Sequence, residues 1–295
     1  MNHGPGKSTA LKCTALGSTI PEGTCLTRQL KRKQELYEHS KQRKRSKTYR
    51  TRRQVLVREK FDLYFQRGTV TQTGYPKGMS DPPLPQCSPR TSNEHSYSFK
   101  LSHGQSRTVN LPSHWSGRFW GRTGCSVSRC ETGDCGGGRL HCSGAGGVPP
   151  VTLAEIIFDG AGNQDFYNIS LVDGFNLPLS MRPRGGTTEV PSGAYYCKPA
   201  GCYTDINNIC PSGMKLYGSG GVVACKSACL AFGRSEYCCS GSHNTPQTCP
   251  NFSYAQTFKS ACPQAYSYAY DDQERTFTCR GAGGRQSEYD ITFCG

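Results

Sequence analysis

Hydrophobic and polar residues alternate in short segments from residue 96 onward. In SYSFKLSHGQSRTVNLP (residues 96–112), aromatic and aliphatic side chains recur at every second position on either side of a His103-Gly104 turn. A period of two is typical of strands with one buried face. The pattern therefore predicts two strands in this stretch.

Further strands are expected in SGRFWGRTGC (116–125), TLAEIIFDG (152–160) and DFYNISLVDGFNLPLSM (165–181), which are bounded by Gly or Pro. The spacing of apolar residues favours a helix only in VVACKSACLAF, residues 222–232. The fold class predicted is mainly β, with disulfide-tied loop regions and one short helical segment.

The front of the chain has a different composition. Residues 26–66 are rich in basic side chains and good helix formers, and residues 68–95 in Gly, Pro and Ser, as in a linker. Of the 35 Lys+Arg and 21 Asp+Glu, residues 1–95 hold 19 and 7, which leaves 16 and 14 for the rest. The basic segment 28–60 could bind nucleic acid or act as a nuclear address, or form a solvated tail that is partly helical or disordered.

Cysteines are concentrated in the same downstream part. Fifteen of the 18 lie between Cys125 and Cys294, which indicates a disulfide framework made in an oxidising compartment. Residues 121–142 contain four of them among six glycines, but without the paired C-x2-C knuckles of a zinc site, so no metal and no cofactor are expected. Because fifteen is odd, one thiol needs a partner from outside this group or stays unbridged.

The differences in composition predict two domains: a basic N-terminal extension over residues 1–95 and a cysteine-rich domain over residues 96–295. Residues 1–23 lack the apolar core of a secretory signal, which conflicts with the cysteine count. No run of 18 apolar residues occurs that would predict a membrane-spanning helix. One interpretation is that an incorrect first exon has replaced the authentic start.

Several motifs of residues 96–295 resemble the thaumatin-like proteins, the plant pathogenesis-related family of sweet proteins, osmotins and permatins. They are GRTGC, CETGDCGG, PPVTLAEIIF, DFYNISLVDGFNLPLSM, ACKSACLAF, EYCCSG, FKSACPQAYSYAYDD and the closing YDITFC. The resemblance implies a flattened β-sandwich, a helix-containing disulfide-rich region around 197–262 and a small bridged ribbon at about 123–150. It also implies seven disulfides: Cys125–Cys130, Cys135–Cys142, Cys197–Cys279, Cys202–Cys262, Cys210–Cys225, Cys229–Cys238 and Cys239–Cys249.

The chain departs from this family at its front. Family members begin with an edge strand whose cysteine bridges to the last one, here Cys294, and the motifs show no counterpart of that strand in residues 1–95. Cys294 would then pair with Cys13, Cys25 or Cys87, or remain unbridged. Without a replacement strand, a row of unpaired backbone groups would be exposed and stability would be lower.

The resemblance also implies an acidic cleft lined by one Arg, one Glu and three Asp. These positions correspond to Arg118, Glu155, Asn168, Asp173 and Asp271, so one of the four acids is an amide in this chain. Asn168 opens a glycosylation sequon, and a second one begins at Asn251. Aromatic residues that could stack on sugar rings are Trp120, Phe175, Tyr266, Tyr268 and Tyr270.

Three functions are therefore considered. The first is a secreted plant defence protein, monomeric and apoplastic or vacuolar, that binds fungal β-glucan or perturbs fungal membranes through the cleft. The second is a weak β-1,3-glucanase that uses Glu155 and Asp173 as its carboxyl pair. The third is a nucleic-acid-binding or nuclear protein led by residues 28–60. A reducing compartment, which would leave the thiols unbridged, counts against this third function.

Overall fold

A computed structural model describes residues 52–59, 63–69, 98–126, 129–135, 142, 145–186, 193–271, 276–282 and 286–294. The compact unit to which they belong spans Thr51–Gly295. Within these ranges, no helix combines the length and the apolar character needed to cross a membrane.

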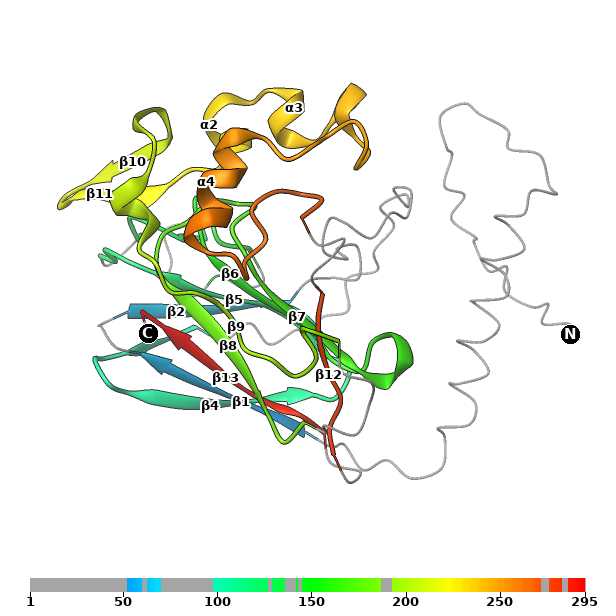
Figure 1. Cartoon of the computed structure of the whole chain (residues 1–295). Helices are drawn as coiled ribbons and strands as arrows, with labels where there is room; N and C mark the ends of the chain where they lie inside the picture. Colours follow the sequence, from blue (N-terminus) through cyan, green and yellow to red (C-terminus); the bar gives the residue numbers. More distant parts are fainter. Residues whose placement is uncertain are drawn as a thin grey trace, which may run out of the picture. The chain divides into compact units, whose positions relative to one another are not determined.

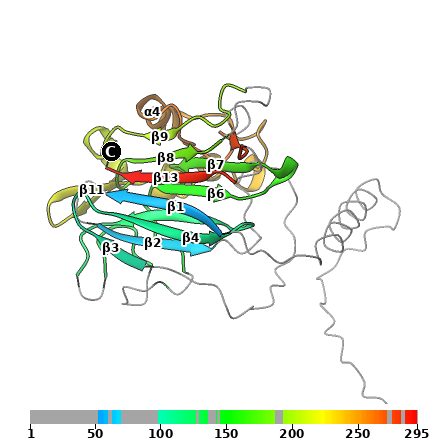
Figure 2. The same cartoon turned by 90° about the horizontal axis from the view of Figure 1, so that it is seen from below.

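Two sheets form the body of this unit (Figures 1 and 2). The five-stranded sheet has the order β4-β1-β13-β8-β9, and the six-stranded sheet the order β12-β7-β6-β5-β2-β3. Strand β1 runs parallel to β13, and the other neighbours in both sheets are antiparallel. The bounds are β1 Arg52–Glu59, β2 Leu63–Thr69, β3 Ser98–Leu101, β4 Ser106–Pro112, β5 Ser116–Arg122, β6 Leu153–Ile157, β7 Asp165–Ser170, β8 Leu179–Arg184, β9 Ala200–Cys202, β12 Phe277–Cys279 and β13 Glu288–Phe293.

A smaller lobe of helices and one hairpin lies on one side of the sheets (Figure 1). Its hairpin pairs β10 (Lys215–Gly218) with β11 (Gly221–Cys225). Its α-helices are α2 (Ala228–Phe232), α3 (Ser235–Cys238) and α4 (Ser253–Ala261). Across the unit as a whole, short 3-10 turns lie at Ala161–Asn163 (η1), Ile206–Ile209 (η2), Ser212–Met214 (η3) and Gly241–His243 (η4). The mainly β fold is confirmed. The helix predicted over 222–232 is wrong at its start, because residues 222–225 belong to β11, and α4 was not predicted.

The core is the space between the two sheets. Alternate residues of facing strands fill it, as the period of two predicts, among them Phe119 of β5, Ile156 of β6 and Ile291 of β13. The two strands expected in residues 96–112 are confirmed as β3 and β4, although they lie in different sheets.

Strand β1 corrects one expectation from sequence. The basic segment was expected to be partly helical or disordered, yet Arg52–Glu59 is a strand whose alternate side chains, Arg53, Val55 and Val57, are buried. The local composition of Lys, Arg, Gln, Glu and Leu indicates a helix, but burial of one face against the core overrides such weak propensities. β1 thus lies beside β13, where the family's first strand had seemed to lack a counterpart. Part of the basic extension belongs to the sandwich, whereas residues 28–51 lie outside the described residues.

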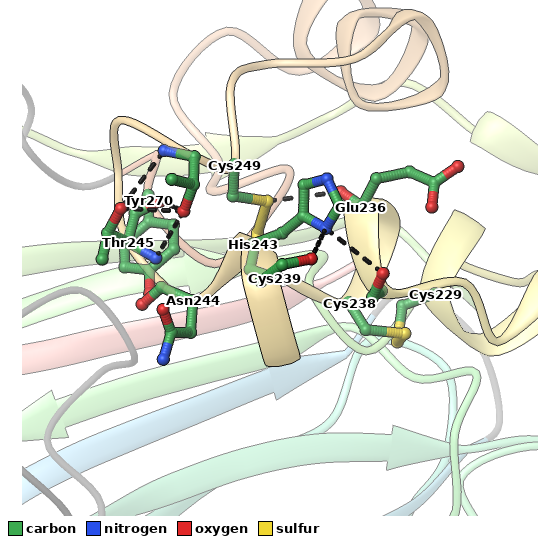
Figure 3. The surroundings of a disulfide bond; sticks show 12 residues. Cys229, Glu236, Cys238, Cys239, His243, Asn244, Thr245, Cys249 and Tyr270 are labelled. Carbon is green, nitrogen blue, oxygen red and sulfur yellow. Dashed lines mark hydrogen bonds between the residues drawn. A yellow bond between two sulfur atoms is a disulfide. The ribbon is translucent and has the colours of Figure 1, made fainter.

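Seven disulfides join the same seven pairs that the family resemblance implies. Cys238 and Cys239 are consecutive but belong to different bridges, to Cys229 and to Cys249 (Figure 3). Cys294 lies outside these seven bridges, and β1 carries no cysteine. Its three suggested partners lie outside the described residues, so the pairing of Cys294 stays a prediction.

Candidate functional site

Three polar side chains lie side by side across the six-stranded sheet. In the strand register, Arg118 of β5 is opposite Glu155 of β6, and Glu155 is opposite Asn168 of β7. Their neighbours along the strands, Phe119 and Ala154 among them, point into the core. Since side chains alternate between faces, the three lie on the sheet face that is turned away from the core. Together with Asp173, which follows β7, we refer to these residues as the charged row.

Glu155 is the central residue of the charged row. Loss of hydration on burial raises the pKa of its carboxyl, and the negative charge of Asp173 acts in the same direction. Arg118 and a hydrogen bond from the Asn168 side chain lower the pKa of Glu155, without cancelling the rise. Glu155 therefore holds its proton to a higher pH than an ordinary glutamate.

Asn168 is only 4% exposed, and its Oδ1 has no hydrogen-bond partner among the described residues. Its side-chain amide is used by Glu155. A glycan on this buried nitrogen would not fit beside Glu155, so the structure disagrees with the suggested glycosylation of Asn168. Asn251 is exposed in the loop before α4, and its glycosylation stays a prediction.

Asp173 forms the solvent-exposed edge of the charged row. Its Oδ2 lies 4.0 Å from Nη1 of Arg118, and both side chains are about one-third to two-fifths exposed (32% for Arg118, 42% for Asp173). An exposed ion pair at this distance contributes roughly 0–1 kcal/mol to stability. The Arg118–Asp173 pair is therefore open to exchange for contacts with a ligand.

Asp271, the fifth residue that the resemblance implied, has different partners. Its Oδ2 accepts hydrogen bonds from the backbone N–H of Ser267 (2.8 Å) and from its hydroxyl (2.9 Å), and lies 2.9 Å from Nζ of Lys259 on α4. Asp271 thus fixes the segment that carries Ser267, and its part in the cleft stays a prediction.

Most of the aromatic residues suggested for sugar stacking are not accessible. Trp120 and Phe175 are fully buried and Tyr266 is 5% exposed. The hydroxyl of Tyr270 donates to the carbonyl of Asn244 (Figure 3). Tyr268 and Tyr270 are both partly exposed, and Tyr268 lines a pocket next to Asp173.

That pocket was missed by sequence reasoning. It measures about 140 Å³ and is lined by Asp173 and by residues of α2, α3 and α4, including Tyr237 and Tyr254. The signal in the sequence was a group of aromatic residues among the cysteines of residues 229–268. Without the helices and disulfides, nothing indicated that they meet.

Comparison with known proteins is consistent with this architecture. A sandwich of two sheets with a disulfide-stapled helical lobe and a charged row defines a thaumatin-type protein. The model of the thaumatin family matches residues 84–295. Thaumatin-like protein 1a of Malus domestica is 52% identical over 202 residues, 66% of this chain and 78% of the relative. Pathogenesis-related protein 5 of Arabidopsis thaliana is 52% identical over 201 residues, with the same coverage.

The chain therefore belongs to the thaumatin family. A third relative, named glucan endo-1,3-beta-glucosidase, from Prunus avium, is 49% identical over 202 residues, again 66% of this chain and 78% of the relative. A defence role fits the names of these relatives, and the seven disulfides fit an extracellular protein. A glucanase-type activity is possible for a chain with such relatives and is not established for this one.

Proposed function

We propose that this protein is a secreted defence protein that binds fungal β-1,3-glucan along the charged row. The observation that carries the proposal is the register that places Arg118, Glu155 and Asn168 side by side, with Asp173 within ion-pair distance of Arg118. Sugar hydroxyls both donate and accept hydrogen bonds. The carboxylates and the guanidinium of the row complement them, while the buried Asn168 amide holds Glu155 in place.

Binding to insoluble β-1,3-glucan tests the proposal. We expect Glu155→Ala and Asp173→Ala each to reduce retention at least fivefold. Glu288→Ala provides a matched control, because Glu288 is a surface acid (40% exposed) on the five-stranded sheet. If all three variants are retained like the wild type, the charged row is not the glucan-binding site. Liposome leakage measured in parallel distinguishes glucan binding from the alternative action on fungal membranes.

Weak hydrolysis by the same residues is the second candidate. It is favoured by the raised pKa of Glu155, which suits a general acid, beside the carboxylate of Asp173. The relative from Prunus avium bears the name of a glucanase. Release of reducing sugar from laminarin at mildly acidic pH, lost in Glu155→Gln, is the expected result. Equal release by the wild type and by Glu155→Gln would exclude this role.

A further inference from the structure

The Cys229–Cys238 bridge differs from the other disulfides in its exposure. Of the seven bridges in the described part of the chain, it alone has no buried cysteine. Each of the other six includes at least one cysteine that is at most 8% exposed. Thiol–disulfide exchange requires a thiolate to reach a sulfur atom, so access decides which bridge reacts first. A reductant in solution therefore reaches Cys229–Cys238 more readily than the other bridges.

Opening this bridge releases only a short piece of chain. Its cysteines are 9 positions apart in the sequence, compared with 82 for Cys197–Cys279 and 60 for Cys202–Cys262. A bridge across a short segment restricts the unfolded chain less than one across a long segment. The two cysteines also stay close together after cleavage, because the loop between them is short, and this favours re-formation of the bridge. Reduction at this position is therefore local and reversible.

The element that this bridge holds in place is α3. This helix has four residues, and its N-cap residue, Arg234, has no side-chain acceptor for the first N–H groups. Its C-cap residue, Cys239, has a φ of 49°, in the left-handed region that is disfavoured for residues with a Cβ atom. A helix this short is not stable by itself. Helix α3 therefore depends on the bridges at Cys238 and Cys239, of which only the first connects it to α2 (Figure 3).

Tyr237 connects α3 with the pocket beside Asp173. It directly precedes Cys238 in the chain, and its side chain lines the pocket together with Asp173, which also belongs to the charged row. Its ring centroid lies 5.1 Å from that of Phe252 and 5.7 Å from that of Tyr254. Displacement of α3 withdraws Tyr237 from these rings and opens the wall. The state of the bridge is thereby linked to the surroundings of the charged row.

We propose that the Cys229–Cys238 bridge is a reversible redox site: a dithiol reductant cleaves it ahead of the other six bridges, and the opened form binds glucan more weakly. One thiolate of the reductant attacks a sulfur atom of the bridge and forms a mixed disulfide, which the second thiol of the reductant then displaces. The protein gains two thiols and the reductant becomes a disulfide, so two electrons and two protons pass to the protein. The effect on glucan rests on the proposed function, whereas the order of reduction does not.

Timed alkylation tests the order of reduction. The folded protein is first treated with N-ethylmaleimide to block thiols that are present before reduction, and the excess is removed. Limiting dithiothreitol is then added, and the new thiols are trapped with iodoacetamide and located by peptide mass mapping. We expect Cys229 and Cys238 to be labelled at least tenfold faster than the cysteines of any other bridge. Labelling of another bridge first, or at a comparable rate, overturns the proposal.

The double variant Cys229→Ser/Cys238→Ser, which mimics the opened form, tests the consequence. Cys125→Ser/Cys130→Ser is the matched control, because that bridge is also local, with its cysteines 5 positions apart, and does not line the pocket. We expect at least fivefold weaker retention on insoluble β-1,3-glucan for the first variant and wild-type retention for the control. Tryptic cleavage after Arg234, an exposed residue of the released segment, should also be faster in the first variant. If the thermal melt shows that this variant does not fold, wild type alkylated at this bridge alone takes its place.

The outcomes separate this inference from the proposed function. If the wild type is retained on glucan and both double variants are retained equally well, the link between the bridge and glucan binding is overturned, while the proposed function stands. If the wild type is not retained at all, the proposed function fails. The order of labelling then still decides whether Cys229–Cys238 is the redox site.

Discussion

Replacement of Arg53 by methionine should destabilise the compact unit by about 3–5 kcal/mol, the usual effect of removing one member of a buried ion pair. Arg53 is 4% exposed and Asp165 is 1% exposed, and the guanidinium donates to the carboxylate. Arg53 also lies 3.4 Å from Asp159 and 4.5 Å above the ring of Phe158. Methionine fills much of the volume of the arginine side chain. It leaves Asp165 buried, with the hydroxyl of Tyr289 and the backbone N–H of Asp159 as its remaining hydrogen-bond donors.

The pH dependence of the stability loss in Arg53→Met provides a further check. Burial raises the pKa of Asp165, while Arg53, the N–H of Asp159 and the hydroxyl of Tyr289 oppose that rise. Without Arg53 the pKa rises further, so the folded state binds its proton more tightly than the unfolded chain does. Stability then falls as pH increases from the ordinary Asp value near 3.8 through the raised pKa. The loss in Arg53→Met should therefore be larger at pH 7 than at pH 4.

Thermal and denaturant unfolding of Arg53→Met is the assay, with Arg182→Met as the control because Arg182 is exposed on β8. For a unit of this size, about 3–5 kcal/mol corresponds to a decrease of roughly 6–20 °C in Tm. The double variant Arg53→Met/Asp165→Asn should recover most of the loss, since replacing both partners is often close to neutral. Equal stability of Arg53→Met and Arg182→Met would refute the placement of β1 inside the sandwich.

Three further predictions follow from the same residues. Glu155→Gln should raise Tm at pH 7 and not at pH 4, because the raised pKa of Glu155 makes its ionised form unfavourable above the ordinary value of 4.5; a gain that is independent of pH would contradict this reasoning. Asn168→Asp should lower Tm at pH 7, since it places a second carboxyl beside Glu155, and the loss should shrink in acid. Val57→Ala should destabilise by about 1–3 kcal/mol in denaturant unfolding, because Val57 is fully buried; a change below 0.5 kcal/mol would argue against β1 as a core strand.

The strands after residue 96 could be predicted because their signal is local. One buried face imposes a period of two, which is visible in residues 96–112 without knowledge of the partner strands. Strand β1 could not be predicted in the same way, because most of its residues are good helix formers and its alternation spans only Arg53, Val55 and Val57. What decides its conformation is the pairing with β13, more than 200 residues away in the chain.

The candidate site was predictable in its residues and not in its geometry. The family motifs pointed to Arg118, Glu155 and Asn168, and the register of β5, β6 and β7 is what places them together. For Asp271 the cleft role stays a prediction, and the contacts of its carboxylate are with Ser267 and Lys259. The pocket depends on the packing of α3 and α4 against each other and against the segment after β7. No local pattern encodes such contacts.

The protonation state of Glu155 determines the chemistry of the charged row, and the neighbouring groups shift its pKa in opposite directions. Burial and Asp173 keep the proton on, whereas Arg118 and Asn168 favour its release. An aspartate at position 168 would shift this balance toward the protonated acid, because two neighbouring carboxylates do not both ionise readily. The amide instead donates to the Glu155 carboxylate and adds no charge. Asparagine at this position therefore favours a row that holds a neutral glucan through hydrogen bonds over one that protonates a glycosidic oxygen, which is why we place binding ahead of hydrolysis.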